Sequence, residues 1–289
     1  MQNFSLKSIK LRYQLISLMA LLLGLLATRR WQQIISPQVW AEDGVRILPQ
    51  YIREGWFSFF EPVNGYLVTI PKIISAVSLE VSFLNYPLIS TILSWLFITL
   101  VGLAIAYSPT KMHDKALCAI AVFMIPSDPE VFGLPLYTFW WSSLLLFLVA
   151  LWDEKVPLIG WRIGFVMICG LSSPVIIAIL PILYFRSYRY RSLHAEHTVA
   201  SIATLIAAVQ LYFILQISSS EAGFPPLESL LKFIVPKFFG RFLIGNWIDN
   251  GLCLWLAGMG VSSLMIGWLI HERHRVCGYC FIFWLYRSC

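Results

Sequence analysis

The sequence predicts an all-α protein that crosses a membrane several times as a bundle of apolar helices. Of its 289 residues, 58% are hydrophobic and only 12% are charged, whereas soluble domains carry about 25% charged residues. Several apolar runs reach the roughly 20 residues with which an α-helix crosses a hydrocarbon layer about 30 Å thick. The composition therefore excludes a water-soluble globular domain. Trp residues lie at or near the ends of these runs, where an amphipathic ring prefers the headgroup layer; they include Trp31, Trp141, Trp152, Trp161 and Trp268.

We expect a single transmembrane domain over residues 1–289, with about seven or eight apolar helices. The first span is predicted over residues 11–28, and because it lacks a small-residue cleavage site it is an anchor and not a secretory signal. Residues 29–83 follow as a long outer loop with interfacial helices, the remaining spans lie within residues 84–270, and residues 271–289 form a basic loop and a short apolar tail. The later apolar runs cover residues 84–107, 116–127, 138–152, 162–185, 198–217 and 251–270.

Cations in the short connecting segments predict the orientation. Cytoplasmic loops of membrane proteins carry an excess of Lys and Arg, which places the amino terminus in the cytoplasm and residues 29–83 on the outer face. Arg29 and Arg30, directly after the first span, oppose this assignment. The cations that support it are Lys7, Lys10, Arg12, Lys111, Lys115, Lys155, Arg162, Arg186, Arg189, Arg191, Arg273 and Arg275. Because they form no continuous basic face, the net charge of +6 does not indicate a nucleic-acid partner.

The apolar run over residues 162–185 is interrupted by the sequence Gly-Leu-Ser-Ser-Pro at residues 170–174. Proline removes a helix hydrogen bond and disfavours helix at the preceding residue. We predict two half-length helices that meet at this break. Because Arg162 and Arg186 both belong to cytoplasmic clusters, these helices would form a hairpin that enters and leaves on the cytoplasmic side. A single helix kinked at Pro174 is the alternative.

Two acidic motifs fall on the predicted outer face. Glu42 and Asp43 lie in the W-A-E-D-G sequence of the first loop, and Asp128 and Glu130 lie in S-D-P-E between the third and fourth spans. Carboxylates that converge from distant positions in the sequence are what a site requires. We therefore expect the two motifs to meet.

Each acidic motif also has a structural interpretation. Asp43 could cap a helix over residues 44–54 that ends at Gly55 in a left-handed conformation. Asp128 could cap a turn ahead of Pro129, a common use of Asp-Pro.

Cations of the first loop would suit an anionic group. A helix start at Pro71 predicts an amphipathic helix that lies in the membrane interface, and this puts Lys72 at the depth of lipid phosphates. Arg46 lies between the acidic motif and Arg53 in the first-loop helix. The alternative for these cations is snorkelling, in which a long side chain reaches water past apolar neighbours.

The first loop resembles that of a known group of proteins. The stretch W-A-E-D-G-V-R-I-L-P-Q-Y-I-R-E-G, with F-F-E-P-V-N-G-Y-L-V-T-I-P-K after it, resembles the first outer loop of bacterial multi-pass membrane proteins related to the GT-C glycosyltransferases. E-V-F-G and G-L-S-S-P followed by I-L-P-I-L-Y-F-R resemble later landmarks, so the likeness runs from about residue 38 to residue 186. The resemblance implies a GT-C-like helix bundle on the bacterial inner membrane. It also implies transfer of a sugar from a polyprenyl-phosphate-sugar donor to a glycan or lipid acceptor on the outer face.

In such enzymes a first-loop acid is catalytic, which maps onto Asp43 or Glu42, and a second acidic motif of some members maps onto Asp128 and Glu130. The chemistry agrees with this mapping. A sugar on a lipid phosphate has a good leaving group, so the enzyme needs a carboxylate to take the acceptor's hydroxyl proton and cations to stabilise the departing phosphate. The first-loop acids would supply the base.

Lys72 or Arg46 would be the phosphate partner. A divalent metal is an open cofactor question: Asp43 with Asp128 or Glu130 would suit Mg²⁺ or Mn²⁺, which prefer oxygen ligands. The sequence H-x-x-H-x-x-C-x-x-C at residues 271–280 is a weaker metal candidate. Zinc fingers separate their ligand pairs by about a dozen residues, which favours a basic loop that runs into a helix.

Two other classes of function stay open. In a transporter or lipid flippase, the break at residues 170–174 would form the substrate site between half-helices. Against this class, the chain shows no internal repeat and almost no ionisable residue within a span. An inactive, truncated remnant is the second class, because the apolar tail at residues 276–286 is too short to span a membrane and GT-C enzymes generally have more spans.

Overall fold

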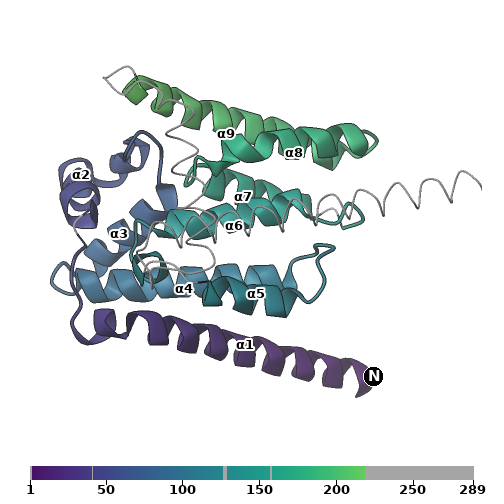
Figure 1. Cartoon of the computed structure of the whole chain (residues 1–289), viewed down its shortest axis with the longest axis horizontal. Helices are drawn as coiled ribbons and strands as arrows, with labels where there is room; N and C mark the ends of the chain where they lie inside the picture. The colour runs from purple at the N-terminus through teal and green to yellow at the C-terminus, as the bar shows by residue number, and fades with distance from the viewer. Residues whose placement is uncertain (1, 41, 126–128, 157, 219–289) are drawn as a thin grey trace, which may run out of the picture. The chain divides into compact units, whose positions relative to one another are not determined.

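The computed structural model describes residues 2–40, 42–125, 129–156 and 158–218 (Figure 1). These residues form an all-helical structure without a β-strand; two isolated bridges join Val63 to Tyr66 and Thr110 to Trp152. Nearly all of them belong to one compact unit, Met1–Met124 with Pro129–Ala222. Several predicted features lie outside the described residues: Asp128, the run over residues 251–270, the H-x-x-H-x-x-C-x-x-C sequence at 271–280 and the tail at 276–286.

In the described part of the chain, the longer helices lie side by side with alternating directions, and α2 and α3 lie at one end of this bundle (Figure 1). Three short irregular helices connect them: a π-helix, Asp43–Ile47 (η1), and the 3-10 helices Gly55–Phe60 (η2) and Pro129–Phe132 (η3). The α-helices are α1 (Gln2–Ile35), α2 (Leu48–Glu54), α3 (Thr69–Val81), α4 (Tyr86–Tyr107), α5 (Lys115–Met124), α6 (Thr138–Ala150), α7 (Ile159–Gly170), α8 (Val175–Arg189) and α9 (His194–Ser218).

Two of the described helices are long and apolar enough to cross a membrane: Tyr86–Tyr107 in α4 and His194–Gln216 in α9. Two hydroxyl groups within α4 bond the helix backbone, since Thr91 Oγ1 donates to Pro87 O at 2.8 Å and Ser94 Oγ donates to Ser90 O at 2.7 Å, whereas the buried Thr99 Oγ1 has no hydrogen-bond partner. Helices α5, α6 and α7 are apolar but have only 10, 13 and 12 residues. The described residues therefore contain fewer helices of spanning length than the sequence predicts.

Helix α1 is longer than the predicted first span. It continues to Ile35 through a kink at Arg30, where φ is −139° and ψ is 33°. The predicted outer loop at residues 29–83 therefore starts too early, since residues 29–35 are helical. We expected the arginines to end the helix, but the residues after them form a further helical turn in a new direction.

Close packing of α1, α4 and α5 forms part of the core. Leu22 and Leu26 of α1 are fully buried in the same cluster as Ile98 of α4 and Phe123 of α5. A Cβ atom added at Gly102 of α4 would lie 2.6 Å from Leu22 Cδ1 and 2.9 Å from a ring carbon of Phe123. The absence of a side chain at Gly102 therefore lets these helices approach.

Cations from several predicted cytoplasmic segments gather at one end of the bundle, which we call the cationic end; it comprises residues 107–115, 150–156, 158–159 and 186–196. Lys111 Nζ lies 2.6 Å from Glu154 Oε1, and the backbone N–H of Asp153 donates to Pro109 O at 2.8 Å. Arg186 Nη1 donates to Ala150 O at 3.1 Å. These connecting segments therefore lie at the same end of the bundle, as the positions of their cations in the sequence predict.

A buried ion triad ties three helices together at the cationic end. Arg162, near the start of α7, makes two hydrogen bonds of 2.8 Å to the two carboxylate oxygens of Glu196, at the start of α9. Arg186, near the end of α8, adds bonds of 2.9 and 3.2 Å to the same carboxylate. Only 1% of the Arg162 side chain and 2% of the Glu196 side chain are exposed. Sequence reasoning treated these arginines as topology signals and missed Glu196 as their shared partner.

The predicted break at residues 170–174 is confirmed. Helix α7 ends at Gly170 and α8 begins at Val175. Because Arg162 and Arg186 both bind Glu196, the start of α7 and the end of α8 lie together, so the two helices form a hairpin. The alternative of a single kinked helix is wrong.

Protein groups surround this break. The Ser172 hydroxyl accepts a hydrogen bond from Ile70 N at 2.9 Å, and the Ser173 hydroxyl lies 2.8 Å from that of Ser143. Gln210 of α9 donates to Gly170 O at 2.8 Å and exchanges two hydrogen bonds with the backbone of Leu67. Neighbouring elements therefore supply hydrogen-bond partners to the polar groups of the break, and these bonds anchor the first loop.

Candidate functional site

The candidate site lies at the opposite end of the bundle, which we call the loop end; it comprises residues 36–40, 42–69, 129–138 and 170–175. The first loop begins there with η1 and α2, which together form the helix predicted over residues 44–54. This helix ends at Gly55, as predicted, but with a φ of 58° and a ψ of −139° Gly55 does not adopt the left-handed helical conformation that we expected. A residue with a Cβ atom adopts such a φ at a steric cost.

Asp43 does not cap this helix. Its Oδ2 has no hydrogen-bond partner, and its Oδ1 accepts a hydrogen bond of 3.1 Å from the backbone N–H of Leu136, at the entrance to α6, instead of from its own helix. The capping interpretation is therefore wrong. The carboxyl joins two segments that lie far apart in the sequence.

The Asp43 carboxyl is enclosed and incompletely paired. Only 1% of the residue is exposed, and Oδ2 has no hydrogen-bond partner. Burial raises the pKa of Asp43 to about 7, and the neighbouring Glu42 carboxylate adds to this effect, while the hydrogen bond from Leu136 opposes it. A carboxyl group with such a pKa exchanges its proton near neutral pH, unlike an exposed aspartate, whose pKa is about 3.9.

Tyr137 brings the two acidic motifs together. The pKa of the Tyr137 phenol is raised to about 12, first by burial and then by the nearby carboxylates of Glu42, Glu130 and Asp43. Glu130 is also a hydrogen-bond partner of this phenol. The structure therefore brings together Glu42, Asp43 and Glu130, as the sequence predicts. Their catalytic role stays a prediction. Tyr137 itself was missed, although it stands directly before an apolar run.

A metal site is not complete in the described part of the chain. No group of three or more His, Cys, Asp and Glu side chains there could hold a metal ion. The predicted ligand Asp128 lies outside these residues. A cation held by Asp43, Glu130 and Asp128 therefore stays a prediction.

Lys72 lies inside the protein and not at its surface. Helix α3 begins at Thr69, two residues before the predicted start at Pro71, and only 2% of Lys72 is exposed. Its Nζ donates to the carbonyl oxygens of Ser58 and Glu61, the latter at 2.5 Å. Burial lowers the pKa of Lys72 to about 8, against the opposing effect of nearby Glu61 and Glu54. The snorkelling interpretation is therefore wrong for Lys72.

We expect Lys72→Met to lower the free energy of unfolding by about 1–3 kcal/mol, because it leaves two enclosed carbonyl groups without their donor. Chemical denaturation of the purified protein in detergent measures this change. Lys155→Met is the control, since Lys155 is exposed and its side chain forms no ion pair within the described residues. A variant with unchanged stability but weaker donor binding would show instead that Lys72 binds the donor.

The remaining cations of the first loop lie at the surface. Arg46 is exposed and forms no ion pair with any residue that the structure describes. Arg53 pairs with Glu54 at 3.0 Å and with Glu61 at 2.7 Å. Such exposed pairs contribute little to stability, and Arg46 is left available for an anion.

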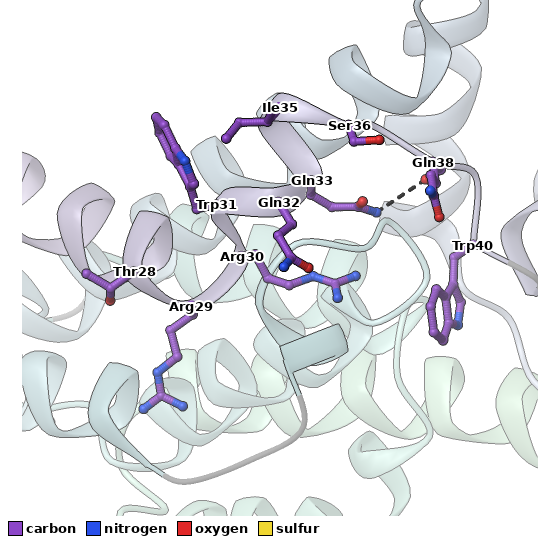
Figure 2. Close-up of a pocket in the computed structure, with 10 residues that line it drawn as sticks. All are labelled: Thr28, Arg29, Arg30, Trp31, Gln32, Gln33, Ile35, Ser36, Gln38 and Trp40. Carbon is purple, nitrogen blue, oxygen red and sulfur yellow. Dashed lines mark hydrogen bonds between the residues drawn. The ribbon is translucent and has the colours of Figure 1, made fainter.

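Sequence reasoning missed a basic pocket at the kink of α1, shown in Figure 2. This pocket has a volume of about 900 Å³. Arg29 lies over the Phe132 ring at 4.6 Å, and Arg30 lies near the Trp40 ring at 5.9 Å. The sequence signal for this pocket is the pair Arg29-Arg30 at the end of an apolar run, which the positive-inside rule interprets only as a sign of orientation. The lining residues include Arg29, Arg30, Trp31, Gln32, Gln33 and Trp40.

Comparisons with protein-family models, curated proteins and solved structures find no match to this chain. The resemblance to the GT-C glycosyltransferases therefore rests on the short motifs of the sequence. The function of the loop end is therefore inferred from the chemistry of its own acidic and basic side chains.

Proposed function

We propose that this chain is a membrane-embedded glycosyltransferase that moves a sugar from a polyprenyl-phosphate donor to a glycan or lipid acceptor at the loop end. The Asp43 carboxyl carries the proposal: it is buried beside Glu42 and Tyr137, one oxygen lacks a partner, and its pKa is about 7. A general base is most effective when its pKa lies near the working pH. The convergence of Glu130 on the same tyrosine adds a second acid.

In the proposed step, the acceptor's hydroxyl oxygen attacks the anomeric carbon of the donor. The bond between that carbon and the phosphate oxygen breaks, and its electron pair leaves with the lipid phosphate. The hydroxyl proton passes to Asp43 or Glu42. Because Asp43 is enclosed, the acceptor reaches its Oδ2 only when η1 moves, and π-helical turns of this kind often occur at functional sites.

Membrane insertion is part of the same proposal. Helices α4 and α9 supply spans, and the loop end would face the outer side of a bacterial inner membrane, with the amino terminus in the cytoplasm. Exposed apolar side chains support this placement: Phe57 and Phe60 on η2 at the loop end, and Val77 and Val81 on the adjoining helix α3. An interfacial surface would remove these groups from water.

Cysteine labelling in right-side-out vesicles tests the orientation. Asn85→Cys, between α3 and α4, should react with an impermeant thiol reagent, whereas His113→Cys, at the cationic end, should react only after the membrane is permeabilised. Both positions are exposed in the structure, and labelling of the parent chain gives the background from its own cysteines. The reverse pattern would put the acidic cluster in the cytoplasm and contradict the proposal.

The geometry of the break weighs against the carrier alternative. A half-helix substrate site needs free backbone groups or side chains. Here Gly170 O accepts from Gln210, Leu171 O accepts from the hydroxyl of Thr69 at 3.0 Å, and both serines of the break are bonded within the protein. The break therefore has a structural explanation.

Transfer from a labelled polyprenyl-phosphate sugar into membrane lipids and glycans tests the activity. The purified parent chain in vesicles is compared with protein-free vesicles, and surface glycans of cells with and without the gene are compared by mass spectrometry. We expect a labelled product and a glycan change that depend on the chain. Absence of both would contradict the transferase and support the inactive remnant.

A further inference from the structure

The pocket at the kink of α1 is chemically suited to an anion. Arg29 and Arg30 both line it, and within the described residues neither forms an ion pair with a carboxylate. The buried Nε of Arg30 has no hydrogen-bond partner. A buried donor without an acceptor costs free energy, so a bound anion would complete this site.

The surroundings hold the guanidinium groups in place. Arg30 lies beside the Trp40 ring and Arg29 above the Phe132 ring. Behind Arg30, a Cβ atom added at Gly133 would lie 2.9 Å from Trp95 Nε1 and 3.8 Å from Arg30 Cβ. Gly133 thus lets the chain before α6 pass close to the kink. Flat guanidinium groups fixed by aromatic rings are well suited to phosphate oxygens.

Among the described residues, the carboxylate of Glu130 acts on Arg30 through space, and it raises the pKa of Arg30 against the larger lowering effect of burial. A single acid does not neutralise two arginines. Within the part of the chain that the structure describes, the pocket therefore keeps a net positive charge.

The position of the pocket favours a lipid as the source of the anion. Arg29 and Arg30 directly follow the apolar part of α1, which exposes Ile16 and Leu21 along its length. Trp31, 56% exposed, lines the pocket, and such rings prefer the headgroup layer. Acyl or prenyl chains could lie along α1 while a phosphate enters the pocket.

We propose that the pocket at the kink of α1 binds the phosphate group of a lipid, with Arg30 and Arg29 as its cationic ligands. Gln32 and Gln33 line the same pocket. Figure 2 shows the Gln33 amide directed toward Gln38, whose carbonyl oxygen it binds at 3.2 Å, so Gln32 is the amide left for the ligand. This site is a phosphate partner different from Lys72 and Arg46. It does not depend on the proposed transfer, because binding can be measured in an inactive chain.

Native mass spectrometry of the purified full chain tests the site with phosphatidic acid, with diacylglycerol, which lacks the phosphate, and with inorganic phosphate. The parent should retain phosphatidic acid in preference to diacylglycerol. Arg30→Gln should raise the Kd for phosphatidic acid about tenfold or more, equivalent to about 1.4 kcal/mol. Arg30→Lys keeps the charge but loses the paired N–H donors of the guanidinium group, so its Kd should lie between those of the parent and Arg30→Gln.

The control Arg191→Gln removes the same charge from an exposed position at the cationic end, away from the pocket, and should bind as the parent does. Asp43→Asn should also bind normally, which separates this site from catalysis. Equal retention of diacylglycerol, or an equal loss in Arg191→Gln, would overturn the proposal. Displacement of the lipid by an equal concentration of inorganic phosphate would overturn the lipid assignment. If Arg30→Gln does not fold, Arg30→Lys and Arg29→Gln decide the outcome.

Discussion

Asp43→Asn is expected to lower glycosyl transfer by about 10²-fold or more, because an amide cannot accept the hydroxyl proton that a general base removes. The substitution is nearly isosteric, and the amide oxygen can still accept the hydrogen bond from Leu136 N. Transfer from the labelled polyprenyl-phosphate sugar is measured in vesicles matched for protein content. Glu42→Gln and Glu130→Gln should have smaller effects.

The stability of the same variant should change in the opposite direction. The folded-state pKa of Asp43 is about 7, above its unfolded value of about 3.9. Between these values the unfolded state releases the proton while the folded state keeps it, so this group's contribution falls as the pH rises and is lost above about pH 7. An amide at this position does not ionise and carries no such penalty. Asp43→Asn should therefore be more stable than the parent at pH 8, by an amount on the order of 4 kcal/mol, and similar to it at pH 4.

Asp114→Asn is the matched control, because Asp114 is exposed and has a φ of 47° that asparagine tolerates. It should change neither transfer nor the pH dependence of unfolding. Transfer by Asp43→Asn within about twofold of the parent would refute the catalytic assignment. Loss of stability at pH 8 would show that the ionised carboxylate has a structural partner.

Features encoded by neighbouring residues could be predicted from the sequence. The break at residues 170–174 follows from Pro174 and its polar neighbours, and the gathering of cations at the cationic end follows from their alternation with apolar runs. Gly55 ends its helix because few other residues accept its φ. These signals are local, so one sequence is enough to read them.

Contacts between distant residues could not be predicted in the same way. Asp43 binds a backbone N–H 93 positions away, and Gln210 binds Leu67 over 143 positions. Lys72 follows the pattern of an interfacial lysine, but folding of η2 over α3 encloses it between two carbonyl groups. Periodicity shows which face of a helix is apolar and does not show which element covers it.

The kink at Arg30 illustrates the same limit. A pair of arginines after an apolar run reads as the end of a span or as a topology signal. In the structure, the non-helical backbone at Arg30 turns the last part of α1, and residues from before and after the kink then line one pocket. A backbone irregularity therefore created the site that the residue pattern alone did not reveal.

Glu196→Gln is expected to lower the free energy of unfolding by about 3–5 kcal/mol, because it leaves Arg162 and Arg186 enclosed without a compensating charge. Arg162 is the more vulnerable, since 1% of its side chain is exposed and its Nε already lacks a partner. Among the described residues, the ion pairs that join α7, α8 and α9 all use this one carboxylate. Denaturation of the detergent-purified variants measures the loss.

Glu154→Gln is the control, because its partner Lys111 is exposed and such a pair contributes little to stability. The double variant Arg162→Met with Glu196→Gln should recover part of the loss, since it removes one of the uncompensated charges together with the acid. A change below about 1 kcal/mol in Glu196→Gln would mean that water reaches the arginines when the carboxylate is gone. The triad would then be a surface cluster, and the hairpin of α7 and α8 would depend on the bonds at its break, from Ser172, Ser173 and Gln210, to hold its two arms together.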